Sequence, residues 1–232
     1  MLSLKLGNSL NTTPTGYNIY SVDMNGTDEY IDLATSKTII NGQAWSCSVW
    51  FTLDSTGGNG TIWQARVNSS NYVNIHYNNS LTELRLAYRL GGSTKLASHT
   101  VDFEGDGKFH HILATWTTSQ INLYIDGTLV DTVNYSGTFS GTFANSMIGQ
   151  NTLGGNYLNG KVAHIGLFTA VKVISDVYIS GQEPIDLTNL SNLVAYYKLD
   201  EGSGTIGFDG SSRNNNASLI NTPTWSSQVP IV

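Results

Sequence analysis

The stretch FHHILATWTTSQINLYIDGTLVDTV, residues 109–133, decides the fold class. Apolar residues alternate with others over residues 112–116 and again, after a polar turn, over residues 121–125. Asp126 and Gly127 then stand where a two-residue hairpin turn requires positive φ, and the alternation resumes after them. A period of two on both sides of turn signals predicts antiparallel sheet. Because apolar residues occur on both faces, we expect these strands near the middle of a sheet and not at its edge.

The rest of the chain consists of short alternating segments separated by turns rich in Gly, Asn, Ser and Thr. The pattern favours one helix, over residues 173–180, which would end at Gly181 as a left-handed cap. Many short strands with so little helix predict an all-β, two-sheet antiparallel jelly-roll sandwich with at most one short helix. Further strands are predicted over residues 20–24, 31–33, 45–51, 61–67, 73–77, 84–90, 96–103, 146–149, 161–168 and 193–199.

The domain organisation follows from what the sequence lacks. There is no internal repeat, no long linker and no shift of composition along the chain. All-β units often reach ~200–250 residues as one domain, so residues 1–232 are predicted to form a single domain. Residues 1–19 are expected to form an N-terminal arm, and residues 193–232 to add strands and a tail that complete the sandwich.

Composition excludes several classes of function. Only 12% of the residues are charged, so uncharged polar groups must cover most of the surface. The net charge of −6, with scattered lysines and arginines, argues against a nucleic-acid partner. Cys47 is the single cysteine, which excludes an intrachain disulfide and a cysteine-rich zinc site. No apolar run reaches the ~18 residues of a membrane span, and residues 1–10 do not read as a signal peptide.

Four segments carry a resemblance to a known family. SVDMNGTDEYIDL, WSCSVWFTLD, KFHHILATWTTSQINLYIDGTLV and LNGKVAHIGLF occur in the order seen in laminin-G-like members of the concanavalin A-like lectin/glucanase superfamily. The chain resembles these proteins from about residue 20 to residue 180, and the hairpin stretch is the most specific part. The resemblance implies a laminin-G-like β-sandwich.

The segment that follows adds a second resemblance. LVAYYKLDEGSGTIGFDGSSRNNNASL, residues 193–219, is similar to a signature that precedes the domain in many cellular members but here comes after it. With the connector PIDLTNLSN and the tail TPTWSSQVPIV, this order resembles laminin-G-like proteins of phage virions. It implies a virion surface protein, such as a capsid decoration or a part of a head or tail fibre.

We therefore expect a non-catalytic binding or assembly module at the virion surface. Its partners would be other virion proteins or a host-surface glycan, with no nucleic acid and no membrane span. Symmetric particle sites favour a homo-oligomer, such as a trimer, or a particle-bound form. The alternatives are an extracellular, free-standing carbohydrate-binding module of the lectin type and, less favoured, a glycoside hydrolase.

The hydrolase alternative is tested against the carboxylates. Retaining glucanases of the superfamily place E-x-D-x-x-E on one strand, because the mechanism needs two carboxyl groups about 5–5.5 Å apart. No two glutamates of this chain share a strand at that spacing, although a pair from distant segments stays open. His110 and His111 are adjacent on a strand and point to opposite faces, so they cannot form one metal site. We predict that the chain is not an enzyme.

Aromatic residues near Asn-rich loops are the candidates for glycan binding. Ring faces stack on sugars, while amides and carboxylates bind the hydroxyl groups. The alternative is that these rings only pack the core. The candidates are Trp63, Tyr72, Tyr77, Tyr88, Tyr135 and Tyr157.

The resemblance also implies a site for a structural calcium ion at the rim of the sandwich. Its ligands would be Asn25, Gly26 and Asp28, with Asp23 nearby. Calcium prefers six to eight oxygen ligands, usually with more than one carboxylate. The late acidic position of the family falls on His164, a poor ligand for so hard a cation. We predict no cofactor, and a weak calcium site completed by backbone carbonyls remains the alternative.

Overall fold

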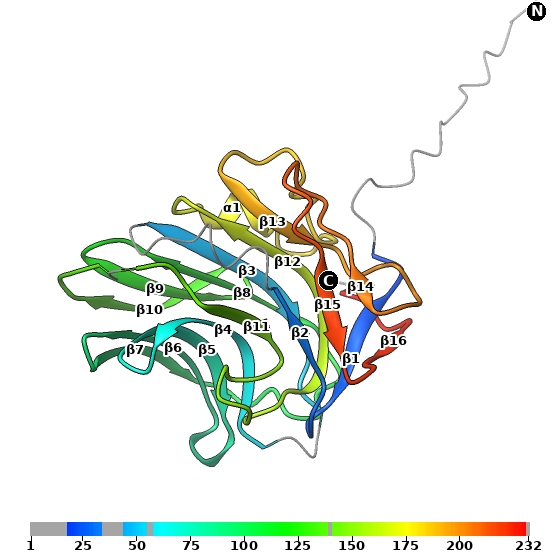
Figure 1. Ribbon diagram of the computed structural model, residues 1–232, viewed down its shortest axis with the longest axis horizontal. Coiled ribbons are helices and arrows are strands. Elements are labelled where there is room, and N and C mark those ends of the chain that lie inside the picture. Colours follow the sequence, from blue (N-terminus) through cyan, green and yellow to red (C-terminus); the bar gives the residue numbers. More distant parts are fainter. Residues whose placement is uncertain (1–17, 34–43, 55–57, 139–140, 231–232) are drawn as a thin grey trace, which may run out of the picture.

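The structure, a computed structural model, describes residues 18–33, 44–54, 58–138 and 141–230. It confirms the predicted fold class, because two eight-stranded antiparallel sheets, here called sheet A and sheet B, pack face to face (Figure 1). Most of the predicted arm, residues 1–19, lies outside the described residues. In order, sheet A contains β10 (Thr128–Asn134), β9 (Gln120–Ile125), β8 (His110–Trp116), β3 (Trp45–Phe51), β12 (Asn159–Phe168), β1 (Ser21–Asn25) and β16 (Thr224–Ser226), and β13 (Leu193–Tyr197) also pairs with β12.

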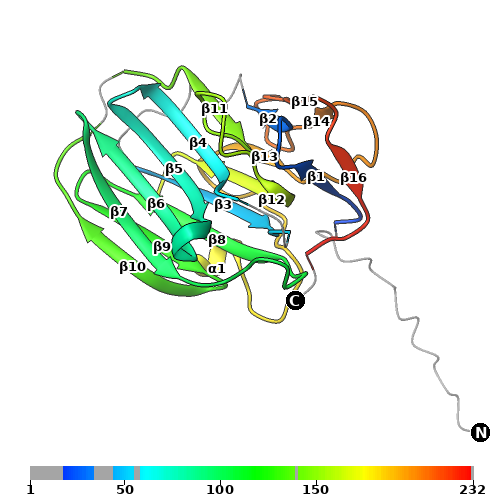
Figure 2. The ribbon, with the colours of Figure 1, turned by 90° about the horizontal axis from the view of Figure 1, so that it is seen from below.

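Sheet B carries the remaining strands, and the same two layers are seen from below in Figure 2. The C-terminal segment contributes to both sheets, since β13 and β16 pair in sheet A while β14 and β15 extend sheet B beyond β2. A single 3₁₀ turn, η2 (Asn79–Leu81), links β5 to β6. In order, sheet B contains β14 (Ile206–Gly207), β15 (Ala217–Ile220), β2 (Tyr30–Asp32), β11 (Asn145–Ile148), β4 (Gly60–Asn68), β5 (Asn71–Asn78), β6 (Glu83–Leu90) and β7 (Ser93–Thr100).

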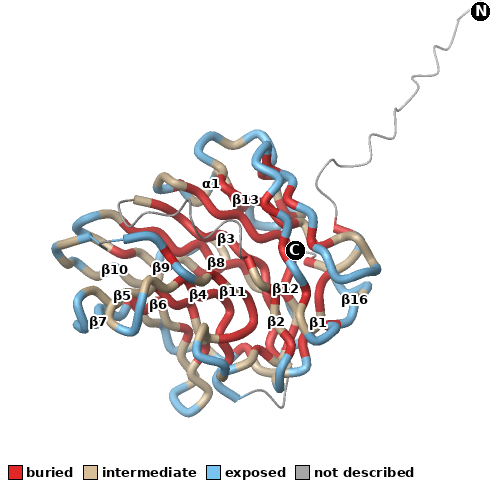
Figure 3. The backbone as a smooth tube through the Cα atoms, viewed as in Figure 1, coloured by how far each residue is buried: buried red, intermediate tan, exposed pale blue. Residues whose placement is uncertain are grey.

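The main hydrophobic core lies between the two sheets. Alternation sends every second side chain of each strand inward, and Figure 3 shows the buried backbone concentrated along the strand centres. Trp45 of sheet A meets Trp63 of sheet B edge-on, with ring centroids 4.7 Å apart. Cys47 is fully buried on the same inward face of β3, as expected for a small hydrophobic residue.

The decisive stretch forms β8, β9 and β10, but its predicted position in the sheet is partly wrong. Strand β8 pairs with β3 inside sheet A, whereas β10 is the edge strand. Leu129 of β10 is 50% exposed. A bulge interrupts the β9–β10 pairing between Leu129 and Asp131, and the Asp131 carboxylate accepts a hydrogen bond from the backbone N–H of Ser98 on β7, at 2.8 Å. Alternation alone does not distinguish an edge strand from an inner one.

The predicted helix is shorter than expected. Helix α1 (Ile174–Val177) has four residues, and the chain is already extended at Tyr178, before Gly181. The predicted cap at Gly181 is therefore wrong, although that glycine does have a positive φ. No helix in the described ranges is long and apolar enough to cross a membrane.

Residues 169–192, here called the strap, cover the outer face of sheet A. Tyr178 packs on Trp50 of β3, and Val177 and Leu187 join a buried cluster with Leu113 of β8. All seven residues of β3 are buried as a result, because the core covers one face and the strap the other. The outward side chains of β4, β5 and β6 in sheet B have no such cover and line an open cleft.

Candidate functional site

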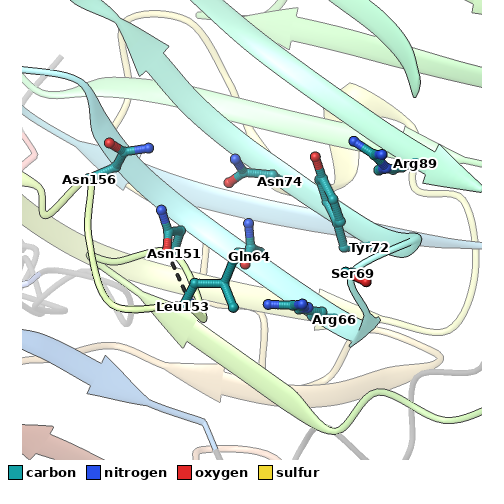
Figure 4. A pocket seen from close by; sticks show the side chains of 9 residues that line it. All are labelled: Gln64, Arg66, Ser69, Tyr72, Asn74, Arg89, Asn151, Leu153 and Asn156. Carbon is teal, nitrogen blue, oxygen red and sulfur yellow. Dashed lines mark hydrogen bonds between the residues drawn. The ribbon is translucent and has the colours of Figure 1, made fainter. Parts of the chain in front are cut away.

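The cleft, of about 290 Å³, lies on the outer face of sheet B over β4, β5 and β6 (Figure 4). Its floor comes from the strands, and one wall comes from the loop that follows β11. Amides and guanidinium groups dominate the lining, and no carboxylate belongs to it. The nine lining residues are Gln64, Arg66, Ser69, Tyr72, Asn74, Arg89, Asn151, Leu153 and Asn156.

Strand register brings the floor residues together from distant parts of the sequence. Arg66 of β4 is paired with Tyr72 of β5, and Tyr72 is paired with Arg89 of β6. Two residues further along each strand, Gln64 of β4 is paired with Asn74 of β5. Residues two apart on a strand share a face, so both rows point outward. The floor therefore presents an Arg–Tyr–Arg row beside a row of amides.

The loop wall is fixed to the floor by hydrogen bonds. Gln64 Oε1 accepts from the Thr152 backbone N–H at 2.9 Å and from the Thr152 hydroxyl at 2.7 Å. Asn151 Oδ1 accepts from the Leu153 N–H at 3.0 Å. Asn156 closes the loop, because its backbone carbonyl accepts from the Thr61 N–H of β4 at 2.8 Å. These bonds hold the loop against the floor and fix the amide of Asn151.

Asn74 offers a hydrogen-bond acceptor to the cleft. Burial, with help from the Arg85 charge, lowers the pKa of His76 to about 4, so this ring is neutral near pH 7. Its Nδ1 can accept from Asn74 Nδ2, 3.2 Å away. The other amide atom of Asn74, Oδ1, is buried and has no partner among the described residues. A buried acceptor without a partner costs about 1–3 kcal/mol, so a small turn of this side chain toward a ligand donor would be favourable.

Within the described part of the chain, the two arginines of the cleft have no acidic partners. Neither Arg66 nor Arg89 forms an ion pair with another described residue. The Arg89 guanidinium lies 5.9 Å from the centre of the Tyr72 ring, and its Nε is buried without a hydrogen-bond partner in the described chain. Glu83, on the same strand as Arg89, is bound to Arg85 at 2.7 Å.

Of the six aromatic residues predicted to bind glycan, only Tyr72 lines the cleft. Trp63, Tyr77 and Tyr88 are fully buried between the sheets, so they present no ring face to a ligand and the prediction is wrong for them. Trp63 instead donates to the Ser146 hydroxyl at 3.2 Å. The inward phase of the alternation, which the sequence already shows, explains this burial.

Tyr135 and Tyr157 are half-buried but lie outside the cleft lining. Tyr135 packs against Tyr88, with ring centroids 4.6 Å apart, and donates to the Thr117 carbonyl. It borders a separate pocket of about 240 Å³ with Lys95. Tyr157 belongs to the loop that forms the cleft wall. A role for either in glycan binding stays a prediction.

The residues predicted to bind calcium make hydrogen bonds within their own turn, and the calcium site stays a prediction. Asn25 Oδ1 accepts from the backbone N–H groups of Thr27 and Asp28, at 2.8 and 3.2 Å, and its amide donates to Asp28. These bonds brace the turn, in which Gly26 supplies a φ of +71°. Among the described residues, no group of three His, Cys, Asp or Glu side chains could hold a metal ion.

Asp23 and His164, the two other positions considered for calcium, also have partners within the chain. Lys161 Nζ lies 3.3 Å from Asp23 and 3.5 Å from Asp54, so the Asp23 carboxylate already has a lysine as its ion-pair partner. His164 is buried on the strap side of sheet A, where its ring is hydrogen-bonded to the Tyr196 hydroxyl at 3.1 Å. Its φ of +52° marks a bulge in β12.

The two neighbouring histidines point to opposite faces of β8. His111 is bound to the Ser48 hydroxyl at 2.9 Å beneath the strap. His110 lies between Asp126, at 2.6 Å, and Asp106, at 2.8 Å. These carboxylates line a cavity of about 400 Å³ between the sheet ends. The pair therefore provides no shared metal site.

The cleft residues other than Tyr72 were not predicted from the sequence. Arg66, Asn74 and Arg89 occupy outward positions of alternating strands, and that phase is visible in the sequence. What the sequence does not show is the register that aligns β4 with β5 and β6. The signal that could have found them is outward-facing basic residues flanking a half-buried tyrosine.

Several solved structures share this fold at low sequence identity. A proposed carbohydrate-binding protein from Bacteroides ovatus aligns with a TM-score of 0.65 and 14% identity over 93% of this chain and 62% of its own. The chain thus spans less than two thirds of that protein. The CBM40 domain of a Ruminococcus gnavus sialidase, bound to sialyllactose, aligns with a TM-score of 0.55 and 12% identity over 69% of this chain and 97% of its own.

Domains LG4-5 of the mouse laminin α1 chain also align, with a TM-score of 0.53 and 14% identity over 70% of this chain and 45% of their own. No curated protein sequence matches the chain. A family model described as the concanavalin A-like lectin/glucanases superfamily, of the laminin G type, matches residues 25–177. Because this match covers more than half of the sequence, the chain belongs to the concanavalin A-like lectin/glucanases superfamily.

Proposed function

We propose that the protein is a non-catalytic carbohydrate-binding module and that the cleft on sheet B is its site. The observation that carries this proposal is the buried Asn74 oxygen, which has no partner among the described residues and lies in a cleft lined by amides and the half-buried ring of Tyr72. Sugar hydroxyls donate and accept hydrogen bonds, while a sugar ring packs on aromatic side chains. The domains of similar fold that carry carbohydrate-binding names support the same class of ligand.

The cleft supports binding and not hydrolysis. A glycosidase needs a carboxylic acid and a second carboxylate on either side of the scissile bond. The lining provides neither, and Glu83 lies six positions from Arg89 on β6, about 20 Å along the strand. The salt bridge of Glu83 to Arg85 further removes it from proton transfer.

For the biological setting, the proposal is the surface of a phage virion, where the cleft would meet a host-surface glycan. The order of segments described above supports this setting, and an extracellular lectin-like module is the alternative. Mass spectrometry of purified particles from the source phage would test it. Recovery of the chain in stoichiometric amount with capsid or tail proteins is expected, and its absence from the particles would contradict the virion setting.

Glycan-array screening followed by calorimetry tests the binding function. We expect at least one saccharide to bind, and Tyr72→Ala to weaken that binding roughly tenfold or more, because aromatic contacts contribute about 0.5–1.5 kcal/mol beyond buried area. Tyr30→Ala is the matched control, because Tyr30 is also half-buried in sheet B but lies outside the cleft. Equal loss in both variants, or no binding to any saccharide, would contradict the proposal.

A further inference from the structure

We infer that the cleft selects saccharides that carry a carboxylate group, such as sialic or uronic acids, over their neutral counterparts. This inference rests on the proposed function and adds the class of ligand. It comes from the charges of the floor.

The cleft is positive in a protein that is negative overall. The chain has a net charge of −6, yet the lining holds two arginines and no carboxylate. Arg66 and Arg89 flank Tyr72 in register, so their backbones lie about 10 Å apart across three strands. The two positive charges repel each other, and an anion between them would be attracted to both.

A second arginine on β6 shows what Arg89 lacks. Arg85 points to the same face, and its Nε donates to the Glu83 carboxylate at 2.7 Å. The Nε of Arg89 is buried and has no acceptor among the described residues. A guanidinium group offers parallel N–H donors that match the two oxygens of a carboxylate. A ligand carboxylate would thus supply Arg89 with the counter-charge that Glu83 supplies to Arg85.

The rest of the cleft favours a sugar acid over a simple anion. Asn74 Oδ1 is an acceptor and would repel an inorganic anion placed against it. The amides of Asn151 and Asn156 on the loop wall can donate and accept in turn. A saccharide with one carboxylate can direct hydroxyl donors to the amide side while its charge lies over the arginine row.

Calorimetry with matched ligand pairs tests the inference. The first pair is 3′-sialyllactose and lactose, and the second is trigalacturonic acid and its methyl ester. The acidic member of at least one pair should bind roughly tenfold to a hundredfold more tightly, because hydrogen bonds to charged groups are the stronger ones. The pair that responds identifies sialic or uronic acid, and the preference should shrink as salt is raised.

Arginine variants connect the preference to the cleft. Arg66→Gln and Arg89→Gln should each weaken binding of the acid more than binding of the neutral partner, so that most of the preference for the acid is lost. Arg213→Gln is the matched control, since it removes the same charge from an exposed loop outside the cleft. Thermal melting verifies that each variant is folded, and the ligand pairs test the wild-type protein even if a variant is not.

The two proposals fail in different ways. Equal affinity within both pairs, with binding that is still sensitive to Tyr72→Ala, would overturn the acid preference and leave carbohydrate binding intact. A preference that survives in both arginine variants would also overturn it. If no acidic or neutral saccharide binds, the proposed function falls, and the inference falls with it.

Discussion

The two sheets resemble each other on their inner faces and differ on their outer faces. The outer face of sheet A is sealed by the strap, and every residue of β3 is buried. The outer face of sheet B is open over β4, β5 and β6, where residues such as Tyr72 and Arg89 stay half-buried around a cleft. One surface thus adds to the stability of the sandwich, and the other remains available for a ligand.

This difference shows how the same alternation gives different outcomes. On β3 the outward residues Ser46 and Ser48 are small and polar, yet both are buried because the strap and β8 supply partners for their hydroxyls. On β5 the outward Asn74 is buried, and one of its amide atoms has no partner among the residues that the structure describes. The strap and β8 thus pair the hydroxyls of the sealed face, while the open face leaves its polar side chains at the edge of the cleft.

The largest expected effect comes from truncating the sealed face. Trp50→Ala would remove a ring that packs against Tyr178 and is 3% exposed, and we expect the free energy of unfolding to fall by about 3–5 kcal/mol. Leu96→Ala is the control on the outer face of sheet B, where Leu96 is 39% exposed, and it should change stability by less than about 1 kcal/mol. Urea denaturation measures the free energy of unfolding of both variants. Similar losses in the two would contradict the proposed difference between the sealed and the open face.

The next effect concerns acid stability and the sealed His111. Burial lowers the pKa of this ring to about 3, with Asp126 opposing and His164 adding to the shift. The unfolded chain therefore takes up the proton first, and stability should fall as the pH drops from about 6.5 to about 3, by at most about 1.4 kcal/mol per pH unit. In His111→Gln this part of the acid loss should disappear from denaturation curves. An unchanged acid limb would show that the ring is not sealed.

The neighbouring His110 should give a smaller effect of opposite sign. Burial alone would lower its pKa, but the hydrogen bonds and charges of Asp126 and Asp106 outweigh burial and raise the pKa above its ordinary value. This stabilisation is fully present below the unfolded pKa of about 6.5 and is lost as the pH rises through the folded pKa. Compared with wild type, His110→Gln should lose less stability between pH 6 and pH 9. NMR titration of the ring, with a midpoint at or below the ordinary value, would contradict this.

The smallest effect is expected at the turn of Asn25 and Asp28, which belongs to neither outer face. Its side-chain oxygens are already bonded within the turn, so adding calcium or a chelator should leave the melting temperature unchanged. A chelator-sensitive melting temperature that Asp28→Ala abolishes would instead reveal a metal site. It would also show that the internal bonds of the turn yield to a cation.

The sequence predicted the sandwich because each strand carries its own alternation. The inward residues of β3, such as Cys47 and Val49, could be assigned from local pattern alone, since the period of two is a property of one strand. The edge position of β10 could not, because an edge depends on which strand is missing beside it. For the strap the sequence predicts only a helix and a connector, because the surface that the strap covers lies on distant strands.

The candidate site was predictable only in part, for the same physical reason. Tyr72 was identified as an aromatic residue near Asn-rich turns, but the Arg66–Tyr72–Arg89 row depends on the register of three strands. Trp63 was misplaced because aromatic residues suit both a core and a sugar site. The burial that decides between these roles is set by the opposite sheet.

The Asp131 carboxylate, which holds the backbone N–H of Ser98, bears on how these molecules could be crowded together. A free row of N–H groups on an edge strand is a template for strands of other molecules, and bulges and charged side chains block such templates. Here the Asp131 side chain, at the bulge of β10, points to the edge strand β7. Its carboxylate accepts a hydrogen bond from the Ser98 backbone N–H, so this N–H is not available to a strand of another molecule. A dense array of copies would then meet through side chains at this corner and would resist fusing into a continuous sheet.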